Sequence, residues 1–173
     1  ATNVVVLGML TNNVIVGYYS AADKLITCVR RGIYAVSDAI YPFISKMMRD
    51  DIPKGLQFIK KQLFLYLIVG LVGCTSLFFF SDTIVRLLFG ADYDLTVDVL
   101  RILSFVPLAV AISTVFGEET MLPLNMNSAY SRTLVLGAFF SLISIFPLCY
   151  LWGAKGVAIT MLLTEFLIMS IMG

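Results

Sequence analysis

Histidine is absent from this 173-residue chain, and charged residues are scarce, at 13% of the sequence. An ordinary soluble domain contains about 25% charged residues, so the composition argues against one. Without histidine, a histidine proton relay is excluded from this chain. The net charge is +1 and no basic run is present, so we expect no nucleic-acid partner.

Cysteine is also sparse. The three cysteines, Cys28, Cys74 and Cys149, lie in three different apolar segments. An odd number of cysteines at membrane depth argues against a disulfide framework or a metal site and favours small buried side chains. The chain also has no nucleophile–base pair, no metal-ligand cluster and no glycine-rich phosphate loop, so the sequence predicts no enzyme activity and no cofactor.

Hydrophobic residues, in contrast, make up 60% of the chain, and the mean hydropathy is +0.95. The uncharged runs Gln62–Ser81 and Thr133–Ala154 contain 20 and 22 residues, enough to cross about 30 Å of hydrocarbon. The 16 uncharged residues Ile102–Gly117 complete a third span if the helix begins near Leu95. These runs predict an all-α integral membrane protein.

We expect about six transmembrane helices, packed as one unit. The sequence predicts a break near Thr11–Asn13, a polar connection over Met47–Gly55, a kink at Pro107 and a tight turn over Trp152–Gly156. The chain stops inside an apolar segment, so we also expect it to be part of a longer protein. The approximate spans are 1–16, 18–46, 58–80, 95–117, 131–151 and 157–173 of the unit 1–173.

Lysine and arginine are distributed unevenly among the predicted connections, and in membrane proteins they concentrate on the cytoplasmic side. Five lie in residues 46–61 and one in 118–132, whereas the connections over 81–94 and 152–156 carry one each. We therefore expect the first two connections to be cytoplasmic and the other two to be external. The residues counted are Lys46, Arg49, Lys54, Lys60, Lys61 and Arg132 against Arg86 and Lys155.

The helix predicted over residues 18–45 carries unusually many charges for so apolar a chain. At 100° per residue, Arg31 and Asp38 lie within about 40° of Lys24, because they follow it at steps of seven. One arc of about 140° holds five charges of both signs with hydroxyl groups between them, and the rest of the circle is hydrocarbon. We call this arc the charged stripe; it consists of Asp23, Lys24, Arg30, Arg31 and Asp38 with Ser20, Thr27, Tyr34, Ser37, Tyr41 and Ser45.

In a membrane protein, such a stripe usually lines water or a polar ligand. Asp23 and Arg30 are two helical turns apart, too far to bond directly within the helix, so the charges need water, a ligand or another helix. We expect a spanning helix that faces a polar cavity. Two alternatives stay open, namely a helix lying flat on the membrane surface and a purely structural pairing with a neighbouring helix.

The charges outside the stripe have simpler expected roles. Asp98 and Arg101 are three residues apart, and we expect them to pair at a helix end. Glu118 and Glu119 are expected to solvate a cytoplasmic helix end. Glu165 lies well inside the last predicted span, where a carboxylate either carries a proton or is satisfied by a hydroxyl group, so it is a candidate for ion coupling.

Four short segments match the motifs of one protein family in the family's order. They are Gly17-Tyr18-Tyr19-Ser20-Ala21-Ala22-Asp23-Lys24-Leu25, Tyr41-Pro42-Phe43-Ile44-Ser45-Lys46, Phe89-Gly90-Ala91-Asp92-Tyr93, and Gly153-Ala154-Lys155-Gly156-Val157-Ala158 followed by Glu165. The first resembles VGxYSAAEK, the second YPxIS, the third FGxxY and the fourth GAxGxAxA…TE. These are segments of the polysaccharide transporter family, the Wzx-type repeat-unit flippases of the MATE-like superfamily. The resemblance implies spans seven to twelve, the C-terminal half of a twelve-helix transporter.

The resemblance also implies a function. The family translocates polyprenyl-pyrophosphate-linked oligosaccharide repeat units across the bacterial inner membrane, for O-antigen or other surface polysaccharide synthesis. Alternating access of a cationic cavity is the implied mechanism, and the bilayer, the lipid-linked oligosaccharide and polysaccharide assembly proteins are the implied partners. From side-chain chemistry, we assign Lys24, Arg30 and Arg31 to pyrophosphate, Asp23 and Asp38 to sugar hydroxyls, and Tyr34 and Tyr41 to sugar rings.

Other functions stay open. A MATE-like drug or cation antiporter shares the fold, but its cavity would be rich in carboxylates and aromatic rings, whereas the stripe has three cations and two anions. A membrane-embedded polysaccharide polymerase or ligase would carry a sizeable external loop, and the external connections predicted here are short.

Overall fold

The structure, a computed structural model, describes residues 2–90 and 92–173, with side chains from Val4 onward. Within these ranges every regular element is a helix, as the composition predicts. The elements are α1 (Thr2–Leu10), α2 (Asn13–Asp50), α3 (Ile52–Phe89), α4 (Asp94–Leu103), α5 (Val106–Phe116), the π-helix η1 (Gly117–Met121) and α6 (Asn127–Met172).

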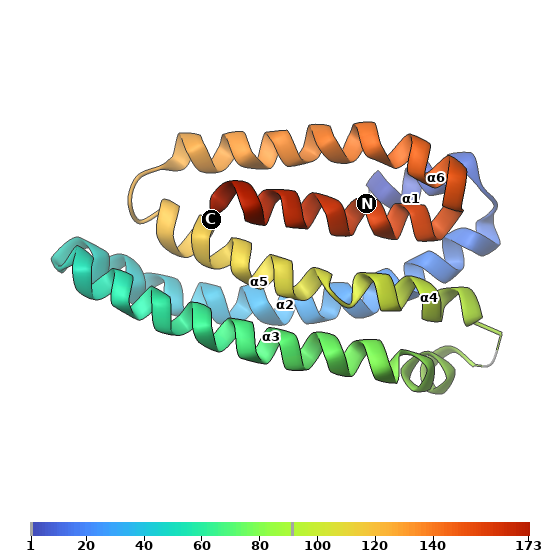
Figure 1. The fold of residues 1–173 in the computed structure, drawn as a ribbon, viewed down its shortest axis with the longest axis horizontal. Coiled ribbons are helices and arrows are strands. Elements are labelled where there is room, and N and C mark those ends of the chain that lie inside the picture. Colours follow the sequence, from blue (N-terminus) through green and yellow to red (C-terminus); the bar gives the residue numbers. More distant parts are fainter. Residues whose placement is uncertain (1, 91) are drawn as a thin grey trace.

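The helices lie with their long axes roughly parallel (Figure 1). α4 and α5 run end to end, and each packs against α2, α3 and α6. α6 turns back on itself at Gly153, where φ is 55° and ψ is −128°. A positive φ costs glycine little, so the chain can reverse there, as the predicted turn over Trp152–Gly156 requires. We call residues 127–152 the first arm of α6 and residues 154–172 its second arm.

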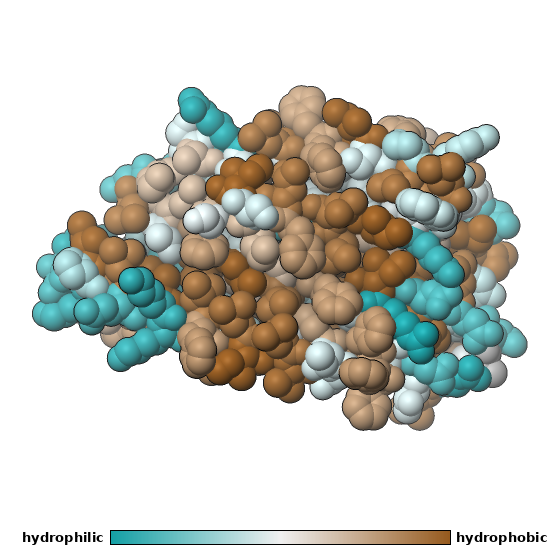
Figure 2. All heavy atoms as spheres, viewed as in Figure 1, coloured by the Kyte–Doolittle hydropathy of each residue, from teal (hydrophilic) through white to brown (hydrophobic). Residues whose placement is uncertain are grey.

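The apolar core lies where α1, α2, α4 and the turn of α6 meet, and it includes the fully buried Leu7, Ile26, Leu100 and Val157. α3 and α6 instead carry large apolar side chains that are exposed. Figure 2 shows that apolar side chains form a broad band between hydrophilic ends. In the described part of the chain, three helical stretches, α3, α4 through η1, and α6, are long and apolar enough to cross a membrane.

The polar connection predicted over Met47–Gly55 is much shorter than expected, because α2 and α3 are separated by Asp51 alone. The Asp51 carboxylate accepts a hydrogen bond from the backbone N–H of Lys54 and lies 2.8 Å from its ammonium group. Hydrogen bonding from the Lys54 side chain holds the pKa of Asp51 below its ordinary value. This N-cap, with Pro53 in the first turn, starts α3 without an intervening loop.

The end of α3 and the break between α4 and α5 also follow from nearby residues. The sequence predicts a loop over 81–94 that contains a short amphipathic piece, Thr83–Phe89, ending at Gly90. The loop is shorter than expected, because α3 continues without a break through this piece, and the helix ends at Gly90 as predicted, where φ is 100°. The pair between Arg86 and Asp82, four residues apart at 2.8 Å, supports these added turns. The helical stretch is interrupted between α4 and α5, just before Pro107, where the sequence predicts a kink.

The connections gather at two ends of the bundle (Figure 1). The α2–α3 junction and the connection after η1 lie at one end, and the α3–α4 connection and the turn of α6 lie at the other. At this second end, the Lys155 ammonium lies 2.7 Å from the Asp98 carboxylate. The predicted pair between Asp98 and Arg101 is therefore wrong, because the α6 turn supplies the cation, while Arg101 donates to Ser81 Oγ at 3.1 Å.

We expect the end that carries the α2–α3 junction to be cytoplasmic, because most lysines and arginines of the connections lie there. Single cysteines placed at Asp50, Asp92 and Trp152, in a variant without the native cysteines, test this in intact cells. An impermeant thiol reagent should label the cysteines at 92 and 152 and spare the one at 50. Ready labelling at position 50 would contradict the orientation.

Candidate functional site: a polar cavity beside the charged stripe

Arg30 of α2 and Glu165 in the second arm of α6 form an ion pair inside the bundle. Arg30 Nη2 lies 3.1 Å from Glu165 Oε1, and the two side chains are 23% and 14% exposed. Arg30 Nη2 also donates to Tyr34 Oη at 3.4 Å, and Asp23 lies close enough to interact electrostatically with the guanidinium. The charge of Arg30 is thus compensated by a carboxylate of another helix. Glu165 is paired with a cation instead of a hydroxyl group.

A cavity of about 140 Å³ opens beside this ion pair, among α2, α5, η1 and the two arms of α6. Its polar lining includes Arg30, Tyr34, Glu118, Tyr130 and Glu165. Tyr130 Oη donates to Glu118 Oε1 at 3.4 Å. The lining therefore offers one guanidinium, two carboxylates and two phenol groups, which suit a ligand rich in hydroxyl groups better than a free anion.

The other charges of the stripe are not brought into this cavity. Lys24, Arg31 and Asp38 are exposed, whereas Asp23 and Tyr41 are half-buried. In the described part of the chain, the side chains of Lys24, Arg31 and Asp38 form no ion pair and no hydrogen bond within the protein. The stripe thus divides into an anchored part around Arg30 and an open part.

Glu119 contradicts the expectation that it solvates a helix end, because its side chain is fully buried. Ser37, a stripe residue, donates from Oγ to Glu119 Oε1 at 2.8 Å. The physical reason is η1, whose wide turn carries the chain's two adjacent glutamates into the bundle. Gly117 permits close packing there, because a Cβ atom would lie 2.7 Å from the Tyr130 ring.

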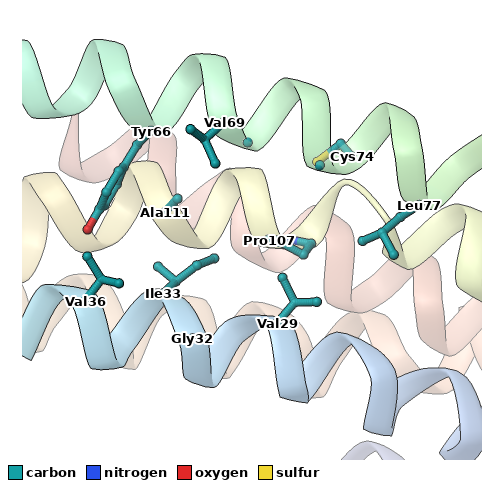
Figure 3. Close-up of a pocket in the computed structure, with 12 residues that line it drawn as sticks. Val29, Gly32, Ile33, Val36, Tyr66, Val69, Cys74, Leu77, Pro107 and Ala111 are labelled. Carbon is teal, nitrogen blue, oxygen red and sulfur yellow. The ribbon is translucent and has the colours of Figure 1, made fainter.

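The hydrocarbon side of α2 faces an apolar groove of about 320 Å³ (Figure 3). Val29, Ile33 and Val36 line it from α2, opposite Val69 of α3 and Ala111 of α5. The two faces of α2 therefore meet different surroundings, one polar and one apolar, as the helical periodicity predicts.

The sequence did not identify Tyr130 and Glu118 as cavity residues. It also did not identify Glu119 and Gln62, which are 0% and 6% exposed, as buried polar groups. The only signal was the position of the two glutamates at the end of an apolar run. A π-helix has no simple sequence pattern, and the long-range pairings depend on which helices become neighbours.

The fold and the cavity together define a class of protein, an α-helical membrane protein with partly buried charges that line a polar cavity. Comparison with known proteins shows which members of this class the chain resembles. The chain is 33% identical over 169 residues to a protein of Escherichia coli K12 named "Putative O-antigen transporter". It is 28% identical over 170 residues to a protein of Shigella dysenteriae with the same name.

These alignments cover 98% of the chain but only 41% and 42% of the two relatives. No family model matches the chain, and no solved structure matches it. The similarity along nearly the whole chain confirms the resemblance to polysaccharide transporters drawn from the sequence. The chain is a multi-pass protein of the bacterial inner membrane.

Proposed function

We propose that the chain is the C-terminal half of a twelve-helix flippase and crosses the membrane about six times. α1 forms part of the first pass, α2 and α3 form one pass each, α4 with α5 forms a fourth, and the two arms of α6 form the last two. The match to the C-terminal part of the relatives, about two fifths of their length, and the reversal of α6 at Gly153 support this count. The open part of the charged stripe on α2 would then face the other half of the flippase.

We further propose that the substrate is an oligosaccharide repeat unit joined through pyrophosphate to a polyprenol. The observation that carries this proposal is the open part of the stripe, where Lys24 and Arg31 are exposed and unpaired on a helix of an otherwise apolar bundle. Cations at such a place need an anionic partner, and a guanidinium binds a phosphate group through two parallel hydrogen bonds.

The remaining candidates take supporting roles. Arg30 lies one position from Arg31 and reaches the pyrophosphate only if it leaves Glu165, which links substrate binding to the partly buried ion pair. Asp23 and Asp38 accept hydrogen bonds from sugar hydroxyls, and Tyr34 and Tyr41 offer ring faces to the sugars. When Arg30 moves to the substrate, Glu165 loses its cation and becomes able to take a proton, which is how it would contribute to coupling during alternating access.

Replacing Arg31 by alanine in the full-length protein should strongly reduce export, because the fork that binds phosphate is lost. Arg31→Lys keeps the charge and should retain more export than Arg31→Ala. The measurement is surface polysaccharide at matched membrane protein level. Arg132→Ala, which removes an exposed cation near the start of α6, serves as the control and should export normally. Normal export by an Arg30→Ala, Arg31→Ala double variant would reject the binding role.

A further inference from the structure

Glu119 is a buried carboxylate without a compensating cation. Its side chain is 0% exposed, Oε1 accepts the hydrogen bond from Ser37, and Oε2 has no hydrogen-bond partner. Among the described residues, no lysine or arginine forms an ion pair with it. Glu165 differs, because Arg30 compensates its charge.

A second polar side chain beside Glu119 is equally unsatisfied. Gln62 of α3 is 6% exposed, and neither its Oε1 nor its Nε2 makes a hydrogen bond. Tyr66, one turn further along α3, is also without a partner at its hydroxyl group. Gln62 lies within reach of both Glu119 and Tyr66, and Tyr66 lies close enough to Glu119 to interact electrostatically, but the distances and angles between these side chains do not meet hydrogen-bonding geometry.

The groups that face this site come from α2, α3 and η1; α5, which also packs against η1, carries no charged or titratable side chain, and Tyr130 of α6 is hydrogen-bonded to Glu118. α2 contributes the Ser37 hydroxyl, α3 contributes Gln62 and Tyr66, and η1 contributes Glu118, a second carboxylate that repels a charge on Glu119. A buried carboxylate in apolar surroundings is stable only when it is neutralised. The site around Glu119 therefore lacks one positive charge, which would neutralise the carboxylate.

A proton meets this need with the atoms present. When Oε2 takes a proton, the carboxyl group becomes a donor, and Gln62 Oε1 or Tyr66 Oη can accept its hydrogen bond after a small side-chain adjustment. An ionised Oε2 can only accept hydrogen bonds, from Gln62 Nε2 or from the Tyr66 hydroxyl group, and its negative charge then stays without a compensating cation.

We propose that the buried Glu119, with Ser37, Gln62 and Tyr66, forms a proton-binding site that is loaded and unloaded during transport. The O–H bond forms at Glu119 Oε2 with a proton taken from water at one membrane face, and the proton returns to water when the site opens to the other face. This proposal rests on the proposed transport function. It assigns a coupling group that is separate from Glu165.

Infrared difference spectra of the purified full-length protein in liposomes test the site without measuring transport. The carboxylic acid C=O band of Glu119 should weaken as the pH is raised, and Glu119→Gln should remove the band. Glu118→Gln, the matched control, should retain it. Gln62→Leu should shift its frequency, which identifies the group even if Glu119→Gln does not fold. A wild-type protein without a titrating band, or a Glu119→Gln protein with an unchanged one, would overturn the proposal.

Two further outcomes separate the alternatives. If sodium at constant ionic strength displaces the band at a fixed pH, while potassium does not, sodium competes with the proton for this site, and the proposal that the site carries a proton alone is overturned. Export by Glu119→Gln should be lost at normal membrane abundance, and unchanged export would overturn the coupling role. If the band titrates but the intact protein supports no polysaccharide export, the proton site stands and the proposed function fails.

Discussion

Replacing Arg30 by glutamine is expected to lower the membrane abundance of the full-length protein severely. The substitution leaves Glu165 inside the bundle without the guanidinium that now lies 3.1 Å away. Breaking a fully buried pair costs about 3–5 kcal/mol, and an exposed pair contributes about 0–1 kcal/mol. Because these side chains are 23% and 14% exposed, we expect a loss of about 2–3 kcal/mol in the free energy of unfolding.

The double variant Arg30→Gln, Glu165→Gln separates folding from function. It removes both charges, so abundance should recover, but export should stay low if Arg30 also binds the substrate. Arg86→Gln, which breaks the exposed pair with Asp82, is the control and should change abundance little. Normal abundance of Arg30→Gln would contradict a stabilising role for the pair, and full export by the double variant would reject a binding role for Arg30.

Replacing Gly156 by alanine is expected to disrupt the turn of α6. A Cβ atom at this buried glycine would collide with the backbone carbonyl group of Leu148, so the two arms would have to separate. Backbone cannot rotate away as a flexible side chain can. Overpacking a core costs about 1–3 kcal/mol, and we expect a value at the upper end here. Membrane abundance and the thermal unfolding temperature in detergent are the measurements.

Gly17→Ala is the matched control, because a Cβ atom at Gly17 would meet no atom within 4 Å. Alanine favours the helix by about 1 kcal/mol relative to glycine, so this variant should be as stable as the native protein or slightly more stable. Equal stability of Gly156→Ala and Gly17→Ala would show that the arms of α6 do not pack as closely as the structure describes.

Several features follow from the sequence because they depend on local or additive properties. The apolar runs predict helices that cross a membrane, whichever neighbours they have. The two faces of α2 follow from a period of 3.6 residues, so Val29 and Ile33 are correctly separated from Lys24 and Arg31. The positive φ of Gly153 follows from a glycine in a short turn.

Helix ends were less predictable, since charge alone does not define a loop. Polar residues around Asp51 predict a connection, yet the same aspartate caps the next helix and shortens the connection to one residue. The pair between Asp82 and Arg86 likewise extends α3 through a segment whose composition suggests a loop.

By itself, the sequence determined that this protein is a helical membrane protein with a charged stripe on α2, similar to proteins named as putative O-antigen transporters. Only the tertiary structure decided which charges are satisfied. Arg30 meets Glu165, Asp98 meets Lys155 instead of Arg101, and Glu119 is buried beside Ser37. These partners lie on different helices, and a π-helix turns Glu119 inward. Helical periodicity specifies the face on which a side chain lies, but the packing of helices specifies what that face meets.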